Sequence, residues 1–277
     1  MPELPEVETI RRDLEAAVLG RTIRAVSLFA PETVKTPSPG EFVARLPGKQ
    51  ILAVARRAKY LILRLSGGDS WILHLMLEGQ FRDLPAAAPI DPLTKLVVEL
   101  DDGTQLRLRD LAGFARTFLL PTEAEASFFA TLGPEPLAAD FDCERFLELL
   151  EGHKGMIKPL LLDQRVVAGV GNLYADEALF RARIHPQRKL STLSREERCR
   201  LHDALVEVLR EGVEHRGTSA RNGFYRDLWG NKGHHQDFLR VFRREGEACP
   251  QCGGTVEKIR VGGRATFVCP ACQLLTR

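Results

Sequence analysis

The 277-residue chain lacks several features that would place it in particular protein classes. No apolar run approaches the roughly 18 residues that span a bilayer, so we expect no membrane partner. Acidic residues precede any apolar stretch at the start, which argues against a secretory signal and favours a cytoplasmic protein. Internal repeats and low-complexity tracts are also missing. What is present is ordinary globular composition, with 44% hydrophobic and 27% charged residues.

The net charge is only +2, so the overall balance does not demand a nucleic-acid partner. The distribution along the chain is more informative. Residues 240–277 hold seven Lys and Arg residues against three Glu residues. This segment is therefore a candidate phosphate contact, and a solvated basic face is the equally simple alternative.

Hydrophobic spacing predicts one helix followed by many strands in the first half. Apolar residues recur at helical spacing over residues 3–19, with Pro5 suited to the first turn. The chain then changes to short segments rich in Val, Ile and Leu, which predict strands at residues 50–55, 60–65, 71–75 and 95–100. Residues 101–104 are typical of a hairpin turn. Together these signals indicate a β-sandwich or barrel-like domain.

Helices dominate the second half, after a proline-rich linker at residues 132–137. Helical patterns follow at residues 143–151, 156–163, 174–181 and 194–212. Ser194 and Glu197 have the spacing of a capping box at the start of the last pattern. Residues 217–235 combine glycines with polar and aromatic residues, which predicts a mobile loop.

Four of the six cysteines form two Cys-x-x-Cys pairs with sixteen residues between them. Two thiolates in each tight turn, brought together by a hairpin, give the tetrahedral sulfur set that zinc prefers. We expect one structural zinc ion bound by Cys249, Cys252, Cys269 and Cys272. Disulfides or a redox pair are the alternatives. The other two cysteines, Cys143 and Cys199, lie in helical patterns and are expected to be ordinary thiols.

The first residues carry a possible nucleophile. A small second residue favours removal of Met1, which leaves Pro2 with a free secondary amine. The pKa of an α-amino group is ordinarily about 8, so a neutral fraction exists at physiological pH. The neutral amine can attack an electrophilic sugar carbon and form an iminium, or Schiff base. Glu3 is a possible acid or base beside it, and Glu6 lies on the same helical face. Acidic residues at a helix start also have a purely structural explanation, through the helix dipole.

Five motifs in register over essentially the full length resemble the bacterial formamidopyrimidine-DNA glycosylase family. They are residues 2–9 (PELPEVET), 56–60 (RRAKY), 132–137 (LGPEPL), 167–177 (VAGVGNLYADE) and 263–273 (GRATFVCPACQ). Leu4 favours this family over the endonuclease VIII group, which has glycine there. The resemblance implies an α+β fold, with an N-terminal helix and β-sandwich domain, then a helical helix-two-turn-helix domain with a zinc-finger β-hairpin.

The resemblance, combined with the element pattern, gives a four-part division. Residues 1–131 form a catalytic β-sandwich domain and residues 132–145 a linker. Residues 146–235 form a helical domain that includes a lesion-binding loop at 217–235, and residues 236–277 form a zinc finger.

The implied activity is that of a bifunctional DNA glycosylase and AP lyase that excises oxidised purines, namely 8-oxoguanine and formamidopyrimidines. By similarity, Pro2 would attack C1′ of the damaged nucleotide and Glu3 would protonate the sugar ring oxygen, with β,δ-elimination following. Lys59 matches a hairpin lysine that reaches the lesion, and its alternative is a solvated strand lysine. Arg264 matches a zinc-hairpin arginine that clamps phosphates.

Glu6 and Glu177 are expected to support the site from nearby. Glu177 matches an acidic residue near the N-terminal amine, and the alternative is a glutamate on a helix surface.

The implied partner is double-stranded DNA with oxidised bases or abasic sites, bound by a monomer associated with the bacterial nucleoid. The residues assigned to DNA binding are His74, Lys154, Asn172, Leu77, Phe114 and Arg221. His74 and Lys154 match backbone contacts, although a strand histidine can instead face the core. Asn172 lies in the helix-two-turn-helix turn, where amides hold phosphates. Leu77 and Phe114 would fill the void left by an everted base, and Arg221 is a candidate contact in the loop.

Two positions depart from the family pattern. Leu77 stands where the family usually has Met, and Ala112 stands where it has an Arg that reads the base opposite the lesion. A bidentate Arg is worth roughly 1–3 kcal/mol of discrimination. We therefore hypothesise that this protein tolerates opposite bases other than cytosine, unless Arg109 or Arg116 substitutes.

Two other functions fit parts of the pattern. An enzyme of the same chemistry could prefer oxidised pyrimidines, as the endonuclease VIII group does. A non-catalytic zinc protein that binds damaged DNA is the second alternative, and the presence of both Pro2 and Glu3 argues against it.

Overall fold

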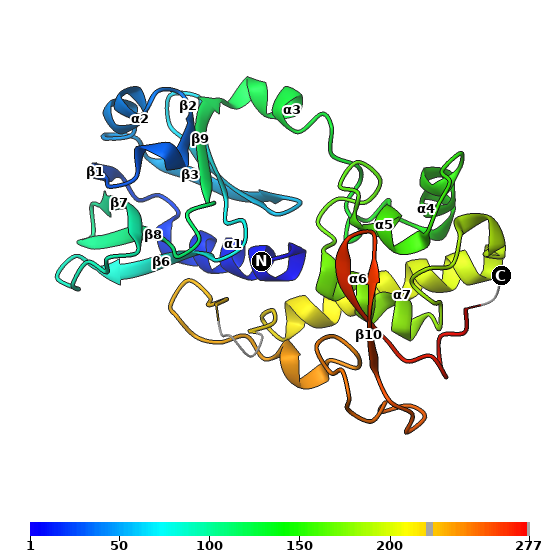
Figure 1. Ribbon diagram of the computed structural model, residues 1–277. Helices are drawn as coiled ribbons and strands as arrows, with labels where there is room; N and C mark the ends of the chain where they lie inside the picture. The colour runs from blue at the N-terminus through cyan, green and yellow to red at the C-terminus, as the bar shows by residue number, and fades with distance from the viewer. Residues whose placement is uncertain (220–223, 276–277) are drawn as a thin grey trace. The chain divides into compact units, whose positions relative to one another are not determined.

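The computed structural model describes residues 1–219 and 224–275, which form two compact units (Figure 1). Unit 1 comprises Met1–Ala130 and His215–Gln236, and unit 2 comprises Thr131–Glu214 and Asp237–Arg277. Arg221, a predicted DNA contact, lies outside the described residues.

Unit 1 contains a long N-terminal helix and two sheets. The helices are α1 (Leu4–Val18), α2 (Pro39–Arg45) and α3 (Glu125–Phe128). One sheet has the strand order β1-β7-β8-β6, formed by Ile23–Leu28, Thr94–Leu100, Thr104–Asp110 and Gly79–Pro85. The other has the order β2-β9-β5-β4-β3, formed by Val34–Thr36, Arg116–Pro121, Asp69–His74, Tyr60–Leu65 and Ile51–Arg57. Short 3-10 turns occupy Pro31–Thr33 and Thr122–Ala124.

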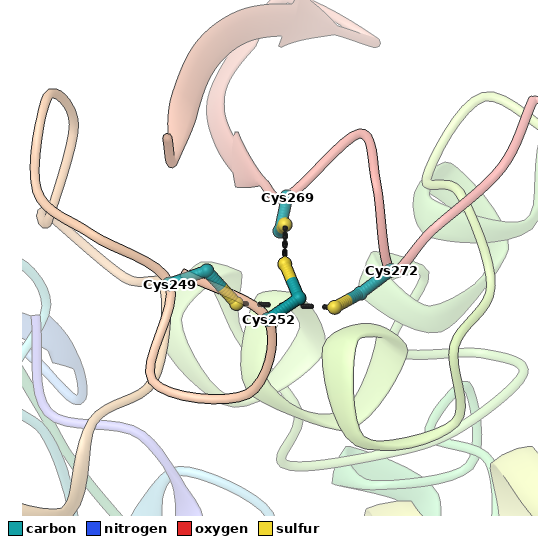
Figure 2. A group of neighbouring side chains, drawn as sticks. All are labelled: Cys249, Cys252, Cys269 and Cys272. Atoms are coloured by element: carbon teal, nitrogen blue, oxygen red, sulfur yellow. Dashed lines mark hydrogen bonds between the residues drawn. The ribbon is translucent and has the colours of Figure 1, made fainter. Parts of the chain in front are cut away.

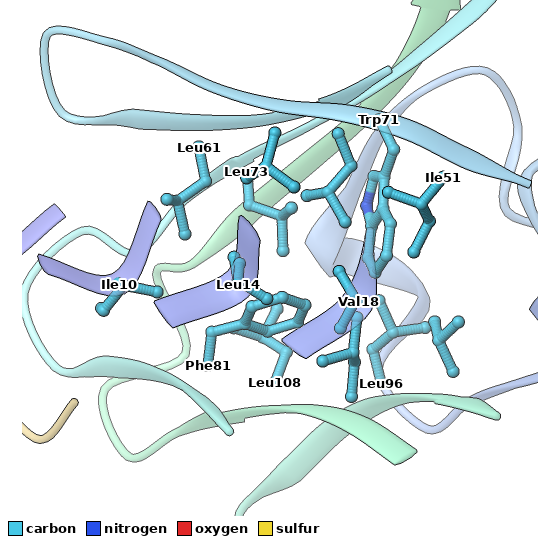
Figure 3. Packing of buried hydrophobic residues seen from close by; sticks show 14 of the residues in the cluster. Ile10, Leu14, Val18, Ile51, Leu61, Trp71, Leu73, Phe81, Leu96 and Leu108 are labelled. Carbon is cyan, nitrogen blue, oxygen red and sulfur yellow. The ribbon is translucent and has the colours of Figure 1, made fainter. Parts of the chain in front are cut away.

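The core of unit 1 lies between these two sheets, and the apolar face of α1 packs into it (Figure 3). Ile10, Leu14 and Val18 meet Trp71 and Leu73 of one sheet, with residues of the other sheet opposite. Because α1 is buried along this whole face, its first turn is held firmly at one end of the core. The predicted helix and the four predicted strands are confirmed, with ends shifted by at most two residues.

The segment 215–236 belongs to unit 1 by its contacts. Its backbone packs on β6, where Leu228 O accepts from the Asp83 N–H at 3.0 Å. The sequence-based division places residues 217–235 with the helical domain. The difference arises because these contacts join positions that are far apart in sequence. The four-part division itself stays a prediction.

Unit 2 is helical, with a small hairpin. Its helices are α4 (Cys143–Leu150), α5 (Ile157–Leu162), α6 (Asn172–Arg181) and α7 (Arg195–Glu214), and its strands are β10 (Glu257–Val261) and β11 (Arg264–Val268). Two 3-10 turns are Leu190–Thr192 and His235–Phe238, the second of which crosses the unit boundary. The predicted capping box is confirmed, because Ser194 N donates to Glu197 Oε2 at 2.9 Å and Glu197 N to Ser194 Oγ at 3.2 Å.

One prediction about unit 2 is wrong. Cys143 and Cys199 are not ordinary thiols but form a disulfide between α4 and α7, with Cα atoms 5.4 Å apart. The pairing follows from helix packing, because α4 lies against α7 and brings the two positions within disulfide range. Neither helical pattern contains that information, since the two cysteines are separated by 56 positions.

Among the described residues, no helix combines the length and apolar character required to cross a membrane.

Candidate active site and DNA interface

The N-terminal site is organised by a capping box at the start of α1. The Glu3 N–H donates to Glu6 Oε2 at 2.8 Å, and the Glu3 side chain accepts from the Glu6 backbone. Both glutamates are buried, and so is Pro2 while Met1 is still attached to it. The second carboxylate oxygen of Glu6 accepts from the Thr218 N–H at 2.7 Å. The residues beside the predicted nucleophile are therefore fixed on two sides.

Lys59 occupies the two-residue turn between β3 and β4, next to Ala58, whose φ is +52°. The turn is tied to α1 through Arg56, which donates to the Ala58 carbonyl at 3.0 Å and pairs with Glu8 at 3.0 Å. Lys59 is 7% exposed, so the alternative of a solvated strand lysine is wrong. The role of Lys59 at the lesion stays a prediction.

His74 ends β5 and is partly buried. Its Nδ1 accepts from the Met76 N–H at 3.0 Å, so the neutral ring carries its proton on Nε2. Burial, assisted by the positive charges of Lys59 and Arg116, lowers the pKa of His74 to about 4. The side chain packs edge-on against Tyr60, with ring centroids 4.5 Å apart. His74 can thus donate one neutral N–H to a phosphate.

This protonation state gives a pH prediction. Because the pKa of His74 lies at about 4, the residue is neutral throughout pH 5.5–8 and contributes no charge to DNA binding there. We expect H74Q to weaken duplex affinity by the same factor at pH 6 and at pH 8. Fluorescence anisotropy at fixed ionic strength measures this, and a loss concentrated at pH 6 would contradict it.

Leu77 and Phe114 are exposed large apolar side chains on two turns of unit 1, as a wedge requires. Leu111, which the sequence analysis did not single out, is equally exposed, at 54%. The turn that carries Leu111 and Phe114 is fixed by Asp110, whose carboxylate accepts from Ala112 N at 3.1 Å and Ala115 N at 2.6 Å.

Arg109 does not replace the family arginine in this structure. Its guanidinium donates to Gln80 at 2.8 Å and to Asp91 at 2.6 Å, which holds it on the sheet. Arg116 lies exposed at the start of β9, opposite His74 in the strand register. The turn between Asp110 and Ala115 therefore presents apolar side chains and backbone only.

The remaining predicted site residues lie in unit 2. Asn172 is the first residue of α6, and its Nδ2 donates to the Ala265 carbonyl of the hairpin at 2.9 Å. Lys154 lies exposed between α4 and α5, and Arg264 lies exposed at the start of β11. Lys154 and Arg264 are thus available on the surface of unit 2, as phosphate contacts require, whereas Asn172 is half-buried and its amide nitrogen already donates to the hairpin.

Glu177 is buried in α6, so the alternative of a helix-surface glutamate is wrong. Its carboxylate accepts from the backbone N–H groups of Arg240, Val241 and Phe242 at 2.8–3.0 Å. Burial raises the pKa of Glu177, and these three donors oppose the rise. Within unit 2, Glu177 anchors the chain that leads into the cysteine-rich segment. Its support of the N-terminal amine stays a prediction.

The hairpin β10–β11 is joined to the helices by a buried ion pair that the sequence analysis missed. Lys158 Nζ lies 2.6 Å from Asp176 Oδ1 and donates to Thr266 Oγ1 at 2.7 Å. Asp176 also accepts from the Phe267 N–H at 3.1 Å. Both charged side chains are fully buried, and desolvation raises the pKa of Asp176 to about 7 although Lys158 opposes this. The pair fixes the strand that carries Arg264.

The four predicted ligand cysteines converge at the base of this hairpin (Figure 2). Their sulfur atoms all lie within 4.8 Å of one another, and Cys249–Cys272 and Cys252–Cys269 are 3.8 and 3.5 Å apart. A zinc–sulfur distance of about 2.3 Å gives a tetrahedron edge of about 3.8 Å. The four thiols thus fit one structural zinc ion, whose closed coordination would stabilise the hairpin.

Comparison with known proteins adds family models, relatives and solved structures. Three models match in order: the formamidopyrimidine-DNA glycosylase N-terminal domain at residues 1–117, the H2TH domain of that glycosylase at 132–222, and a zinc finger found in FPG and IleRS at 246–274. A formamidopyrimidine-DNA glycosylase of a Roseiflexus species is 46% identical over 99% of this chain and 100% of its own length. The chain belongs to the formamidopyrimidine-DNA glycosylase family.

Other members of the glycosylase family agree. The Herpetosiphon aurantiacus protein is 45% identical over 99% of this chain and all of its own length. A Lactococcus lactis FPG mutant in complex with Fapy-dG-containing DNA has a TM-score of 0.93 at 36% identity, covering 99% of this chain and 100% of its own. A Lactococcus lactis Fpg complex with abasic-site DNA has the same TM-score and identity, covering 98% and 99%. The α+β fold and the zinc finger expected of a formamidopyrimidine-DNA glycosylase are confirmed.

Proposed function

We propose that this protein is a bifunctional DNA glycosylase and AP lyase that excises oxidised purines and cuts the strand through a Schiff base on Pro2. The observation that carries the proposal is the buried capping box at the start of α1, in a chain of this family. The box holds Glu3 beside the amine that removal of Met1 would expose. A relative that is complexed with Fapy-dG-containing DNA supports the purine substrate.

The proposed chemistry follows from these groups. The neutral Pro2 nitrogen bonds to C1′, the glycosidic bond breaks, and the base leaves with its electron pair and takes up the proton that the nitrogen loses. Glu3 gives a proton to the sugar ring oxygen as the ring opens, which leaves an iminium. Loss of the acidified C2′ proton expels the 3′ phosphate, and a second elimination expels the 5′ phosphate. Water then releases the amine.

The other predicted residues have binding roles in this proposal. Buried Lys59 would reach the lesion, and the neutral His74 would donate to a phosphate. Lys154, Asn172 and Arg264 would hold the backbone from unit 2. Bound zinc would keep the hairpin of Arg264 folded. Because the substrate is DNA and the relatives are bacterial, we also propose a cytoplasmic, nucleoid-associated monomer.

Borohydride trapping tests this function. A duplex with one abasic site should yield a covalent protein–DNA adduct with this protein, because hydride reduces the iminium to a stable amine. A protein that only binds damaged DNA would give no adduct, which would contradict the proposal.

Oxidised pyrimidines are the second candidate substrate. A Lactococcus lactis FPG, 36% identical with a TM-score of 0.92, is complexed with DNA that contains an oxidised pyrimidine. Single-turnover excision of 8-oxoguanine and of thymine glycol separates the two candidates, and we expect 8-oxoguanine to be excised faster.

The base opposite the lesion should be discriminated weakly. The turn that holds Ala112 presents no guanidinium, and Arg109 is engaged by Gln80 and Asp91. We expect excision of 8-oxoguanine opposite C and opposite A to differ by less than about tenfold, since the missing contact is worth roughly 1–3 kcal/mol. Single-turnover rates on the two duplexes measure this, with A112R expected to restore a preference for C. A strong wild-type preference for C would refute the idea.

A further inference from the structure

Arg216 has a strained backbone and an unusual pair of partners. Its φ is +58°, a left-handed conformation that L-residues rarely adopt. One guanidinium nitrogen, Nη2, lies 2.7 Å from both Asp13 Oδ2 and Asp227 Oδ2. The two carboxylates are 4% and 1% exposed, whereas Arg216 is 40% exposed. Strain of this kind persists where the surrounding contacts determine the conformation.

These contacts connect α1 to the segment that follows α7. Asp13 lies in α1 and also accepts from the Leu228 backbone. Asp227 accepts from the backbone N–H groups of Trp229 at 3.1 Å and Asn231 at 2.8 Å. Arg216 therefore joins α1 to the turn that follows Asp227, and the carboxylate of Asp227 holds this turn together.

The next residues continue the connection to the N-terminal site. Gly217, with φ of +79°, passes so close to Glu6 that a Cβ there would lie 2.8 Å from Glu6 Cγ. Thr218 N then donates to Glu6 Oε1 at 2.7 Å, and Glu6 Oε2 holds the Glu3 N–H at 2.8 Å. An unbroken series of contacts thus runs from Asp13 and Arg216 through Glu6 to the residue that follows Pro2.

We propose that Arg216, together with Asp13, is a positioning residue for the N-terminal nucleophile. Its ion pairs fix the backbone at Gly217 and Thr218, which orients the Glu6 carboxylate, and Glu6 in turn orients Glu3 and the adjacent amine. The proposal rests on the function proposed above. Reaction rates are sensitive to such placement, because a displacement of about 1 Å costs on the order of 100-fold.

The test uses four variants of the whole chain and a fifth variant as control. R216G removes the guanidinium and adds no backbone strain, because glycine adopts positive φ readily. R216K keeps a charge that can reach one carboxylate. E6Q changes the next group in the series, and R216G/E6Q completes a double-mutant cycle. R45Q is the matched control, since Arg45 is 39% exposed and pairs with the buried Asp69 at 2.6 Å outside this network.

The measured quantities are the borohydride trapping rate at saturating abasic-site duplex, the Kd for a duplex with a tetrahydrofuran site, and Tm. We expect R216G and E6Q each to slow trapping about tenfold, the double variant to lose less than about 30-fold, and R216K to fall between R216G and wild type. The Kd of R216G should stay within about threefold of wild type, because Arg216 acts through Glu6 and not through phosphates. R45Q should trap at the wild-type rate.

Three results would overturn the inference: wild-type trapping by R216G, losses that multiply in the double variant, or a weakened Kd with an unchanged saturated rate, which would identify a phosphate contact. Failure of the proposed function has a different signature, since wild type and R45Q would then give no adduct at all.

Discussion

P2Q should give no covalent adduct with abasic-site DNA and should lower single-turnover strand cutting at least about 1000-fold, since it removes the nucleophile itself. Glutamine is too large a second residue to favour removal of Met1. The chain would therefore begin with the α-amino group of Met1, one residue away from the position of the Pro2 nitrogen. The capping box would persist, because it uses only backbone and side-chain groups of Glu3 and Glu6, which the substitution leaves in place.

P2G is the informative companion to this variant. Its Met1 is expected to be removed, which restores a free amine, but a primary one without the proline ring that fixes the N–Cα bond. Its trapping rate should lie between those of wild type and P2Q. Mass spectrometry of each protein establishes which N-terminus it carries. Wild-type trapping by a P2Q chain that retains Met1 would contradict the proposed nucleophile.

C272S should remove the zinc ion and most of the DNA affinity. Structural zinc contributes roughly 10–16 kcal/mol of apparent binding free energy in zinc-finger peptides, so the loss of one ligand should unfold the base of the β10–β11 hairpin. Arg264 would then no longer be held on that hairpin. We expect metal analysis to fall from one zinc per chain to below about 0.1, and Kd for a tetrahydrofuran-site duplex to rise at least about 100-fold.

The control for C272S is the double variant C143S/C199S, which removes two cysteines that are outside the sulfur cluster. It should keep one zinc per chain and wild-type affinity. Full DNA affinity in zinc-free C272S would contradict a stabilising role for the metal.

Local patterns in the sequence were sufficient for the elements and for the metal ligands. The apolar spacing of α1 predicts its burial, because periodicity alone decides which face of a helix meets a core. The cysteine spacing predicts the sulfur cluster, because two tight turns and one hairpin leave few other arrangements. The family motifs single out Lys59 and Glu177 as site residues, and the structure shows that both side chains are buried.

Contacts between distant positions could not be predicted from one sequence. Arg216 and Asp13 are separated by 203 positions, and Lys158 and Thr266 by 108. Arg216, Asp13 and Lys158 are charged residues for which a solvated side chain is the ordinary expectation. Their partners become apparent only when the helices and loops are packed, and the same holds for the disulfide between Cys143 and Cys199.

The disulfide between Cys143 and Cys199 has a topological consequence. It closes a covalent ring that contains α5, α6 and the surface stretch around Lys154. A peptide bond hydrolysed anywhere inside that ring would leave the two fragments tethered, and only a reductant would let them separate. In an oxidised sample, a protein nicked by a protease at the exposed Lys154 would still migrate as one chain.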